Sequence, residues 1–394
     1  MGNNSIVDAY FINCREIIVK YPELASKIVR YKVFVREDGT LVGSNRSINF
    51  IAENTFGPLR IYGLKDGEKF VSGKPTLIIE GLGYELVNLE TTYLGYLSYS
   101  GAVSEMASIV READGVPIID MSARHYPWQI IEEVSLAAYL GGAAGTSTKA
   151  GHEYVQRFYG PGDKFKLYAS LPHAMAAVVA QMAEREGLFP SVMAAKLFHE
   201  IFPDRPITVL VDYEGRELDV AQQAFEVFGE KLFAVRLDTH GGRQHQGVSD
   251  LQVFLDSGLK NAVHEYFKDY SGKTLPELIA TISERFPYIP DASKYFIGNG
   301  VTVSANYMMR EFLDEIGAHN VKIVVSSGFT KEKVAAFTLA KAPMDFIGTG
   351  SWVRFASFTS DISHVLEDGI WVYRAKVGRD HSAEDKLPLL FERK

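Results

Sequence analysis

The chain has 394 residues, of which 46% are hydrophobic, with a formal net charge of −8 and a sequence pI near 5.8. This length suffices for a large core and two domains, and the acidic balance excludes nucleic acid or an anionic membrane as the main partner, because both need a basic field. The single cysteine, Cys14, excludes an intrachain disulfide and a cysteine-cluster zinc site, so a reducing cytoplasm is the expected compartment. No signal-peptide pattern and no apolar run long enough to cross a bilayer is present, and small molecules are the expected partners.

The first part of the chain, residues 1–110, mixes short alternating segments with turn signals. Residues 32–35 and 76–80 have the pattern of strands, and the Asp-Gly pairs in 37–39 and 65–67 are typical of turns. We expect an α+β domain rich in antiparallel strands, to which residues 355–394 return.

From residue 111 to 354, short apolar runs alternate with helical patterns. The strands are predicted at 116–119, 165–169, 207–211, 232–237, 321–325 and 345–347, and the helices at 129–140, 173–186, 218–228 and 306–316. So many alternating units predict a parallel sheet, in an irregular β/α barrel more than in an open sheet. The stretch 247–303, which contains Pro276, Pro287 and Pro290, is longer than one crossover needs and is interpreted as a helical insertion.

Three of these strands end in small polar or charged clusters, in the segments 234–239, 321–328 and 344–350. A β/α barrel carries its chemistry at the carboxyl ends of its strands, so the functional site is expected there. The Gly-Thr-Gly-Ser sequence at 348–351 can bring backbone amides close to an anion, and we expect it to bind phosphate.

Charged residues follow the strands as well. Arg236 and Asp238 alternate across one residue and therefore face the same side of a strand, either as a structural ion pair or to meet a ligand. Asp212 ends another strand in the same way, and Arg124 and His125 follow the strand 116–119.

Other polar residues are less specific. The glycine-rich segment 141–151 follows a helix, and it predicts either a tight helix-to-strand turn or a ligand-binding loop with hydroxyls from Thr146, Ser147 and Thr148. It is not a nucleotide P-loop, because no glycine directly precedes its lysine and no strand is predicted before it. His173 stands at a strand-to-helix junction, where a histidine is more often a cap or packing residue than a catalyst. His240, Arg243 and His245 are predicted to lie in a polar surface loop.

In order along the chain, these clusters resemble the nicotinate phosphoribosyltransferase family, within the type II phosphoribosyltransferases. The resemblance covers most of the chain and is carried by the segments 8–11 (DAYF), 90–95 (ETTYLG), 122–127, 141–148, 171–174 (LPHA), 209–212, 235–239, 325–329 and 347–351. It implies an N-terminal α/β domain completed by the C-terminal residues, a funnel-like barrel, and a homodimer or higher homo-oligomer with shared active sites.

The family reaction moves ribose 5-phosphate from phosphoribosyl pyrophosphate to a pyridine nitrogen and releases pyrophosphate in NAD salvage. It requires anion sites, Mg²⁺ and carboxylates that stabilise a cationic sugar. By resemblance, Asp212 and Asp238 face the ribose and the metal, with Asp238 as the metal ligand, while Arg124 and Arg236 meet anionic groups. The 5-phosphate would be held by Ser327, Gly328, Gly348, Thr349 and Gly350.

The resemblance also assigns roles to three further residues, one that ATP can phosphorylate and two that contact the pyridine base. His173 matches a histidine that ATP can phosphorylate to drive the reaction, which leaves ATP open as a co-substrate. Tyr10 matches an aromatic residue that stacks on the pyridine ring across the dimer. Met121 stands where relatives usually have a second stacking aromatic.

The chain departs from the family where the base is recognised. His125 replaces a second arginine, and it is a weaker and pH-dependent partner for a carboxylate. Two alternatives to nicotinate transfer therefore stay open. One is a type II phosphoribosyltransferase for another base, such as nicotinamide, quinolinate or an unassigned ring; the other is a non-catalytic homologue that binds a phosphorylated metabolite.

Overall fold

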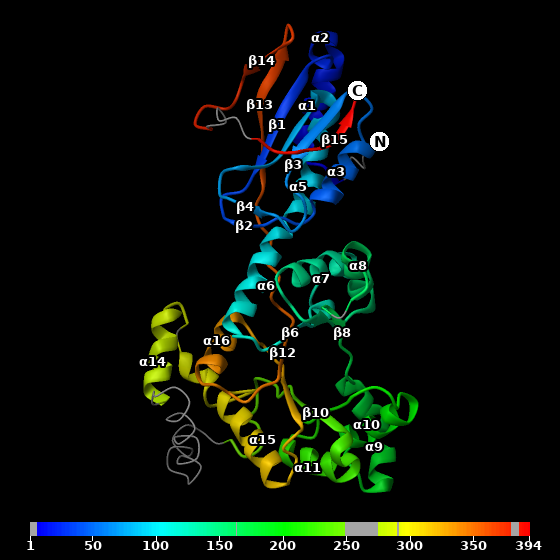
Figure 1. Cartoon of the computed structure of the whole chain (residues 1–394), viewed down its shortest axis with the longest axis vertical. Helices are drawn as coiled ribbons and strands as arrows, with labels where there is room; N and C mark the ends of the chain where they lie inside the picture. Colours follow the sequence, from blue (N-terminus) through cyan, green and yellow to red (C-terminus); the bar gives the residue numbers. More distant parts are fainter. Residues whose placement is uncertain (1–5, 163, 249–274, 290, 380–385) are drawn as a thin grey trace. The chain divides into compact units, whose positions relative to one another are not determined.

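The computed structural model describes residues 6–162, 164–248, 275–289, 291–379 and 386–394 (Figure 1). The chain divides into two compact units. Unit 1 comprises Met1–Ala107, Leu136–Gly141 and Val353–Lys394, and unit 2 comprises Ser108–Ser135 and Gly142–Trp352. No helix in the described ranges has the length and apolar content to cross a membrane.

Unit 1 is built on an antiparallel sheet. Within the described residues the sheet has six strands in the order β14-β13-β1-β5-β3-β15. Their bounds are β1 Ile28–Phe34, β3 Leu59–Gly63, β5 Pro75–Leu82, β13 Thr359–Glu367, β14 Ile370–Tyr373 and β15 Leu389–Arg393. Because β13 pairs with β1 and β15 pairs with β3, the C-terminal residues complete the N-terminal sheet.

Helices and a short ribbon accompany this sheet, and one face of the sheet carries the core. The helices are α1 Ala9–Lys20, α2 Pro22–Ala25, α3 Ser44–Glu53, α4 Gly83–Leu86, α5 Glu90–Leu97 and α6 Ser100–Glu112, and the ribbon consists of β2 Gly39–Thr40 and β4 Lys69–Phe70. Val33, Ile61 and Ile79 are fully buried in the core, as expected of apolar residues that alternate along strands.

Unit 2 contains a parallel sheet that positions the predicted site. Within the described residues it has seven strands in the order β8-β7-β6-β12-β11-β10-β9. The bounds are β6 Ile118–Asp120, β7 Gly145–Thr146, β8 Lys166–Leu167, β9 Ile207–Leu210, β10 Leu232–Leu237, β11 Lys322–Val325 and β12 Phe346–Thr349. All neighbouring pairs are parallel, so every strand ends at the same edge of the sheet. Strands β8 and β9 follow each other in the sequence but lie at opposite ends of the sheet. The sheet is a curled half-barrel.

Helices follow most of these strands. They are α7 Ile131–Leu140, α8 Lys149–Tyr159, α9 His173–Glu186, α10 Pro190–Ile201, α11 Glu217–Phe228, α14 Leu275–Arg285, α15 Val303–Glu315 and α16 Lys331–Leu339. Packing of α10 on β9, α11 on β10 and α15 on β11 covers the sheet in the manner of a β/α barrel.

The predicted fold class is confirmed: an N-terminal α+β domain completed by the C-terminus, and an irregular, half-open β/α barrel. Part of the expected insertion at 247–303, including Pro290, lies outside the described residues. Its described part holds α14 and the 3₁₀ helix Ala292–Tyr295, and α15 begins at its last residue, Val303.

Candidate active site

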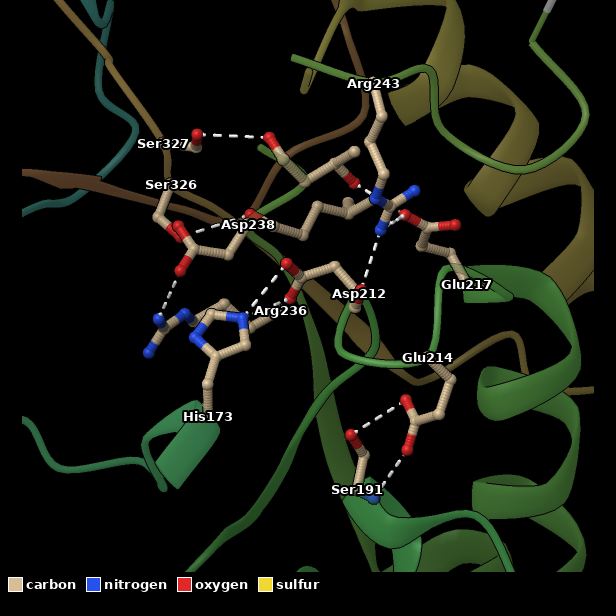
Figure 2. A network of polar contacts seen from close by, with 12 residues as sticks. His173, Ser191, Asp212, Glu214, Glu217, Arg236, Asp238, Arg243, Ser326 and Ser327 are labelled. Atoms are coloured by element: carbon tan, nitrogen blue, oxygen red, sulfur yellow. Dashed lines mark hydrogen bonds and ion pairs between the residues drawn. The ribbon is translucent and has the colours of Figure 1, made fainter. Parts of the chain in front are cut away.

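The first contact at the carboxyl edge of the sheet joins a histidine to an aspartate. His173 is the first residue of α9, and Asp212 follows β9; Nε2 of His173 lies 3.0 Å from both carboxylate oxygens (Figure 2). Asp212 is buried, and burial raises the pKa of its carboxyl group, while the hydrogen bond and the charge of His173 lower it. The imidazole is half exposed, so this pair combines a buried carboxylate with an accessible ring.

A second contact chain runs from β10 to β11. The Nη2 group of Arg236 donates to Oδ2 of Asp238 at 2.8 Å, and Nη1 donates to the hydroxyl of Ser170 at 2.7 Å. The hydroxyl of Ser326 donates to the other oxygen of Asp238 at 2.8 Å (Figure 2). The same-face placement that the alternation predicted is thus present, and the two charges form an ion pair.

Behind these residues lies a buried network that sequence reasoning missed. Glu217, the first residue of α11, is fully buried and accepts from the hydroxyl of Thr239 at 2.9 Å and the backbone N–H of Gln246 at 3.0 Å. Arg243 lies 2.6 Å from Glu217 and also donates to the backbone carbonyl of Asp212 at 2.7 Å (Figure 2). Burial alone would raise the pKa of Glu217, but hydrogen bonding to Arg243 and the charge of His245 bring it below its usual value. This network fixes the loops after β9 and β10 relative to each other.

The loop after β10 differs in one respect from the prediction. His245 is not a surface residue: it is 1% exposed, with Nδ1 bonded to the carbonyl of Gln246 at 2.9 Å. The prediction was wrong because the loop packs on α15 through Val248, which makes an apolar cluster with Ala305 and Met308. Burial lowers the pKa of His245.

The turn after β11 has the geometry of an anion site. Ser327 and Gly328 both have positive φ angles, 74° and 69°. In the described part of the chain, the backbone N–H groups of Ser327, Gly328 and Phe329 donate to no protein acceptor. Successive free amides in a turn of this kind form an anion-binding concavity.

A second turn, after β12, lies beside the first. The hydroxyl of Thr349 donates to the backbone carbonyl of Phe329 at 2.7 Å, and this bond ties the two turns together. Within the described residues, the N–H groups of Gly350 and Ser351 also lack a protein acceptor. The two turns together hold five amides without a protein acceptor among the described residues, and we call them the double turn (Ser327–Phe329 and Gly350–Ser351).

Met121 and His125 pack against this second turn. A Cβ atom on Gly348 would lie 2.5 Å from Sδ of Met121, and one on Gly350 would lie 2.5 Å from Nε2 of His125. His125 also bonds through Nδ1 to the hydroxyl of Ser351 at 3.0 Å. The glycines are therefore required by the close approach of the Met121 and His125 side chains.

The remaining predicted residues have different surroundings. Thr146 is fully buried and its hydroxyl donates to Asp120 at 3.0 Å, while Thr148 caps α8 by accepting from Gly151 at 3.3 Å. Ser147 and Arg124 are exposed, and Arg124 makes no ion pair with any described residue. The segment 141–151 contains a strand that was not predicted, β7, so its glycines serve a helix-to-strand turn.

Tyr10 belongs to unit 1, at the start of α1. It is 62% exposed, and its hydroxyl contacts Asp8 at 3.4 Å.

The acids at this edge are candidate ligands for a metal ion. Among the described residues no group of three or more histidine, cysteine, aspartate or glutamate side chains could hold a metal ion. Mg²⁺ is commonly bound by one or two carboxylates together with substrate phosphates, and Asp238 could supply such a ligand.

Comparison with known proteins relates the chain to phosphoribosyltransferases. The family model for the N-terminal domain of quinolinate phosphoribosyl transferase matches residues 8–100. Nicotinate phosphoribosyltransferase pncB1 of Mycobacterium tuberculosis is 31% identical over 182 residues, a match that covers 45% of this chain and 38% of that protein. The match thus spans well under half of the relative's length.

Solved structures share the fold. Nicotinate-nucleotide pyrophosphorylase from Pyrococcus furiosus superposes with a TM-score of 0.66 at 24% identity, over 95% of this chain and 78% of that one. Human nicotinic acid phosphoribosyltransferase superposes with a TM-score of 0.57 at 14% identity, over 91% of this chain and 75% of that one.

The fold is similar to that of solved type II phosphoribosyltransferases, and the sequence matches are to phosphoribosyltransferases as well. Its resemblance to the nicotinate phosphoribosyltransferase family within that class, inferred above from ordered sequence segments, is confirmed by the mycobacterial relative.

Proposed function

We propose that the chain is a nicotinate phosphoribosyltransferase of NAD salvage, which transfers ribose 5-phosphate from phosphoribosyl pyrophosphate to the pyridine nitrogen. The observation that carries the proposal is the double turn beside two carboxylates at one edge of the sheet. Phosphoribosyl pyrophosphate needs both features, because its phosphates are anionic and its ribose becomes cationic during transfer.

In this reaction the bond from C1 of the ribose to the pyrophosphate oxygen breaks, and pyrophosphate leaves with the electron pair. The lone pair of the pyridine nitrogen then forms the new bond to C1. The double turn would hold the 5-phosphate, and Asp212 and Asp238 would face the sugar as positive charge develops on it. Arg236, which already bridges Asp238 and Ser170, would meet the departing pyrophosphate.

Mg²⁺ bound to the pyrophosphate would neutralise its charge, with Asp238 as the protein ligand. ATP is proposed as a co-substrate through His173, whose ring is accessible beside Asp212. A homodimer or higher homo-oligomer with shared active sites is also proposed, in which the exposed Tyr10 of one subunit would stack on a base bound by the other.

A second candidate is transfer to another base, such as nicotinamide or quinolinate. The observation that favours it is the pair of side chains at the second turn: Met121 and His125 lie against Gly348 and Gly350 in place of an aromatic and an arginine. A non-catalytic phosphometabolite-binding homologue is disfavoured, because simple phosphate binding would not require Asp212 and Asp238.

The test is a product assay with phosphoribosyl pyrophosphate, Mg²⁺ and a panel of bases, with and without ATP. Nicotinate mononucleotide and pyrophosphate in equal amounts are expected. The Arg124→Gln and His125→Gln variants, assayed with nicotinate and with uncharged nicotinamide, then show which side chain meets the carboxylate. Formation of a different mononucleotide would establish the second candidate. If none of the bases on the panel leads to release of pyrophosphate, both candidates are contradicted.

A further inference from the structure

A buried lysine lies at the turn after β11. Lys333, in the first turn of α16, is 9% exposed, and its ammonium group donates to the backbone carbonyl of Ser327 at 2.9 Å. Its nitrogen also lies 4.4 Å from the centre of the Phe329 ring and 6.0 Å from that of Phe337. The positive charge is therefore held against the first half of the double turn.

This charge has little compensation in the protein. No carboxylate among the described residues lies within ion-pair distance of Lys333. The charge of Asp238 favours the protonated form of Lys333, but Asp238 is itself paired with Arg236. Burial lowers the pKa of Lys333 to about 7, against the attraction of Asp238. A buried cation without a paired anion costs free energy, and the faces of two rings offset only part of that cost.

The turn that Lys333 contacts is unusual as well. Ser327 is not a glycine, yet its φ angle is +74°, a conformation that residues with a side chain rarely adopt. A bond to its carbonyl from a fixed ammonium group stabilises this peptide orientation, in which the next amides lack protein acceptors. Conformations of this kind persist where the surroundings hold them, and they often occur at ligand sites.

We propose that Lys333 is a positioning residue for the anion at the double turn: it fixes the Ser327–Gly328 backbone and supplies the positive charge that a bound phosphate group neutralises. This inference rests on the proposed function for the identity of the ligand, the 5-phosphate of phosphoribosyl pyrophosphate. The phosphate site then includes a cation that contacts the turn at the backbone carbonyl of Ser327.

Two variants separate charge from hydrogen bonding. Lys333→Met keeps an apolar stem against the rings and removes both the charge and the donor, whereas Lys333→Gln keeps an amide donor without the charge. Lys322→Met is the matched control, because Lys322 begins β11 at the opposite end of the strand, is half exposed and pairs with Asp345 at 2.9 Å.

Two measurements test the role. The first is the rise in Tm caused by inorganic sulfate, which needs no turnover and follows from binding to the folded state. The second is the pair of KM and kcat values for phosphoribosyl pyrophosphate. For Lys333→Met we expect a weaker sulfate effect and a KM about tenfold higher, with kcat nearly unchanged, as for loss of one charged contact. Lys333→Gln should fall between Lys333→Met and the wild type, and Lys322→Met should match the wild type.

Without sulfate, the Tm of Lys333→Met should equal or exceed that of the wild type, because an uncompensated buried charge is removed. A purely structural lysine would instead lower Tm and leave the sulfate-induced rise intact, and that result would overturn the proposal. A fall in kcat at unchanged KM would overturn it too. If no base is turned over but the sulfate effect still depends on Lys333, the proposed function fails and this inference stands. If turnover is normal but the sulfate effect does not depend on Lys333, the proposed function stands and this inference fails.

Discussion

The Nε2 atom of His173 lies 3.0 Å from both carboxylate oxygens of Asp212. A carboxylate can only accept, so Nε2 carries the hydrogen, and the lone pair of a neutral ring is at Nδ1. The pair therefore has the arrangement of an oriented nucleophile, with a buried acid that fixes the ring and supports positive charge on it.

From this pair we predict that ATP phosphorylates His173. Incubation with ATP labelled at the γ-phosphate should yield an acid-labile, base-stable phosphate, with Nδ1 as the acceptor nitrogen. His173→Gln should abolish labelling and ATP hydrolysis while leaving some ATP-independent transfer. The control is His152→Gln, which replaces a histidine in α8. Absence of both labelling and stimulation by ATP would leave His173 a structural role only.

Asp238→Asn is predicted to remove most turnover without loss of the fold. The amide keeps the size of the side chain but loses the charge directed at the developing sugar cation, an effect that typically costs about a hundredfold or more in kcat. Because the same change also breaks an arginine pair, Asp314→Asn is the control: Asp314 pairs with Arg310 at 2.7 Å in α15, outside the proposed site. Near-normal kcat in Asp238→Asn would show that the site is misplaced.

Gly350→Ala is predicted to raise the KM for phosphoribosyl pyrophosphate. The added methyl group would lie 2.5 Å from Nε2 of His125 and 3.2 Å from the carbonyl oxygen of Met121, so either the imidazole or the turn must move. Gly162→Ala is the control, since a Cβ atom there meets nothing within 4 Å. Steady-state kinetics of both variants measure the two KM values, and equal KM values would show that neither this turn nor the position of the His125 imidazole affects the binding of phosphoribosyl pyrophosphate.

Glu90 in α5 should give unit 1 a pH-dependent stability. Burial and the charges of Asp361 and Asp8 raise the pKa of this carboxyl from 4.5 to about 7. The folded state therefore binds the proton more tightly than the unfolded chain, and this contribution to the free energy of unfolding is present below pH ~4.5 and is lost as pH rises through ~7.

Glu90→Gln should consequently match the wild type near pH 4.5 and exceed its free energy of unfolding above pH ~7. Denaturant titrations at pH 4.5, 6 and 8 measure the difference, with Glu16→Gln as a control at an exposed position of α1. A constant difference across these pH values would mean that Glu90 ionises normally in the folded protein.

Part of this structure follows from local sequence. The helix that starts at His173 and the strand Leu232–Leu237 have the bounds that the periodicity predicted, because strong apolar patterns specify both. Strand β7 has only two residues, Gly145 and Thr146, and no apolar pattern, so only its pairing with β6 and β8 defines it.

The buried support of the site could not be predicted in the same way. Glu217 and Arg243 are separated by 26 positions, and both have residue types that usually lie at the surface. Only the fold brings them together beneath Asp212. The position of Glu217 directly before the predicted helix 218–228 was a signal for a structural role, but nothing in the sequence identified its partner.

The most direct test is a crystal structure with phosphoribosyl pyrophosphate and Mg²⁺. We predict that the 5-phosphate lies within hydrogen-bonding distance of the amides of Gly328, Phe329 and Gly350, with the ribose facing Asp212 and Asp238. A 5-phosphate bound elsewhere, with the double turn bonded to water or protein, would contradict it.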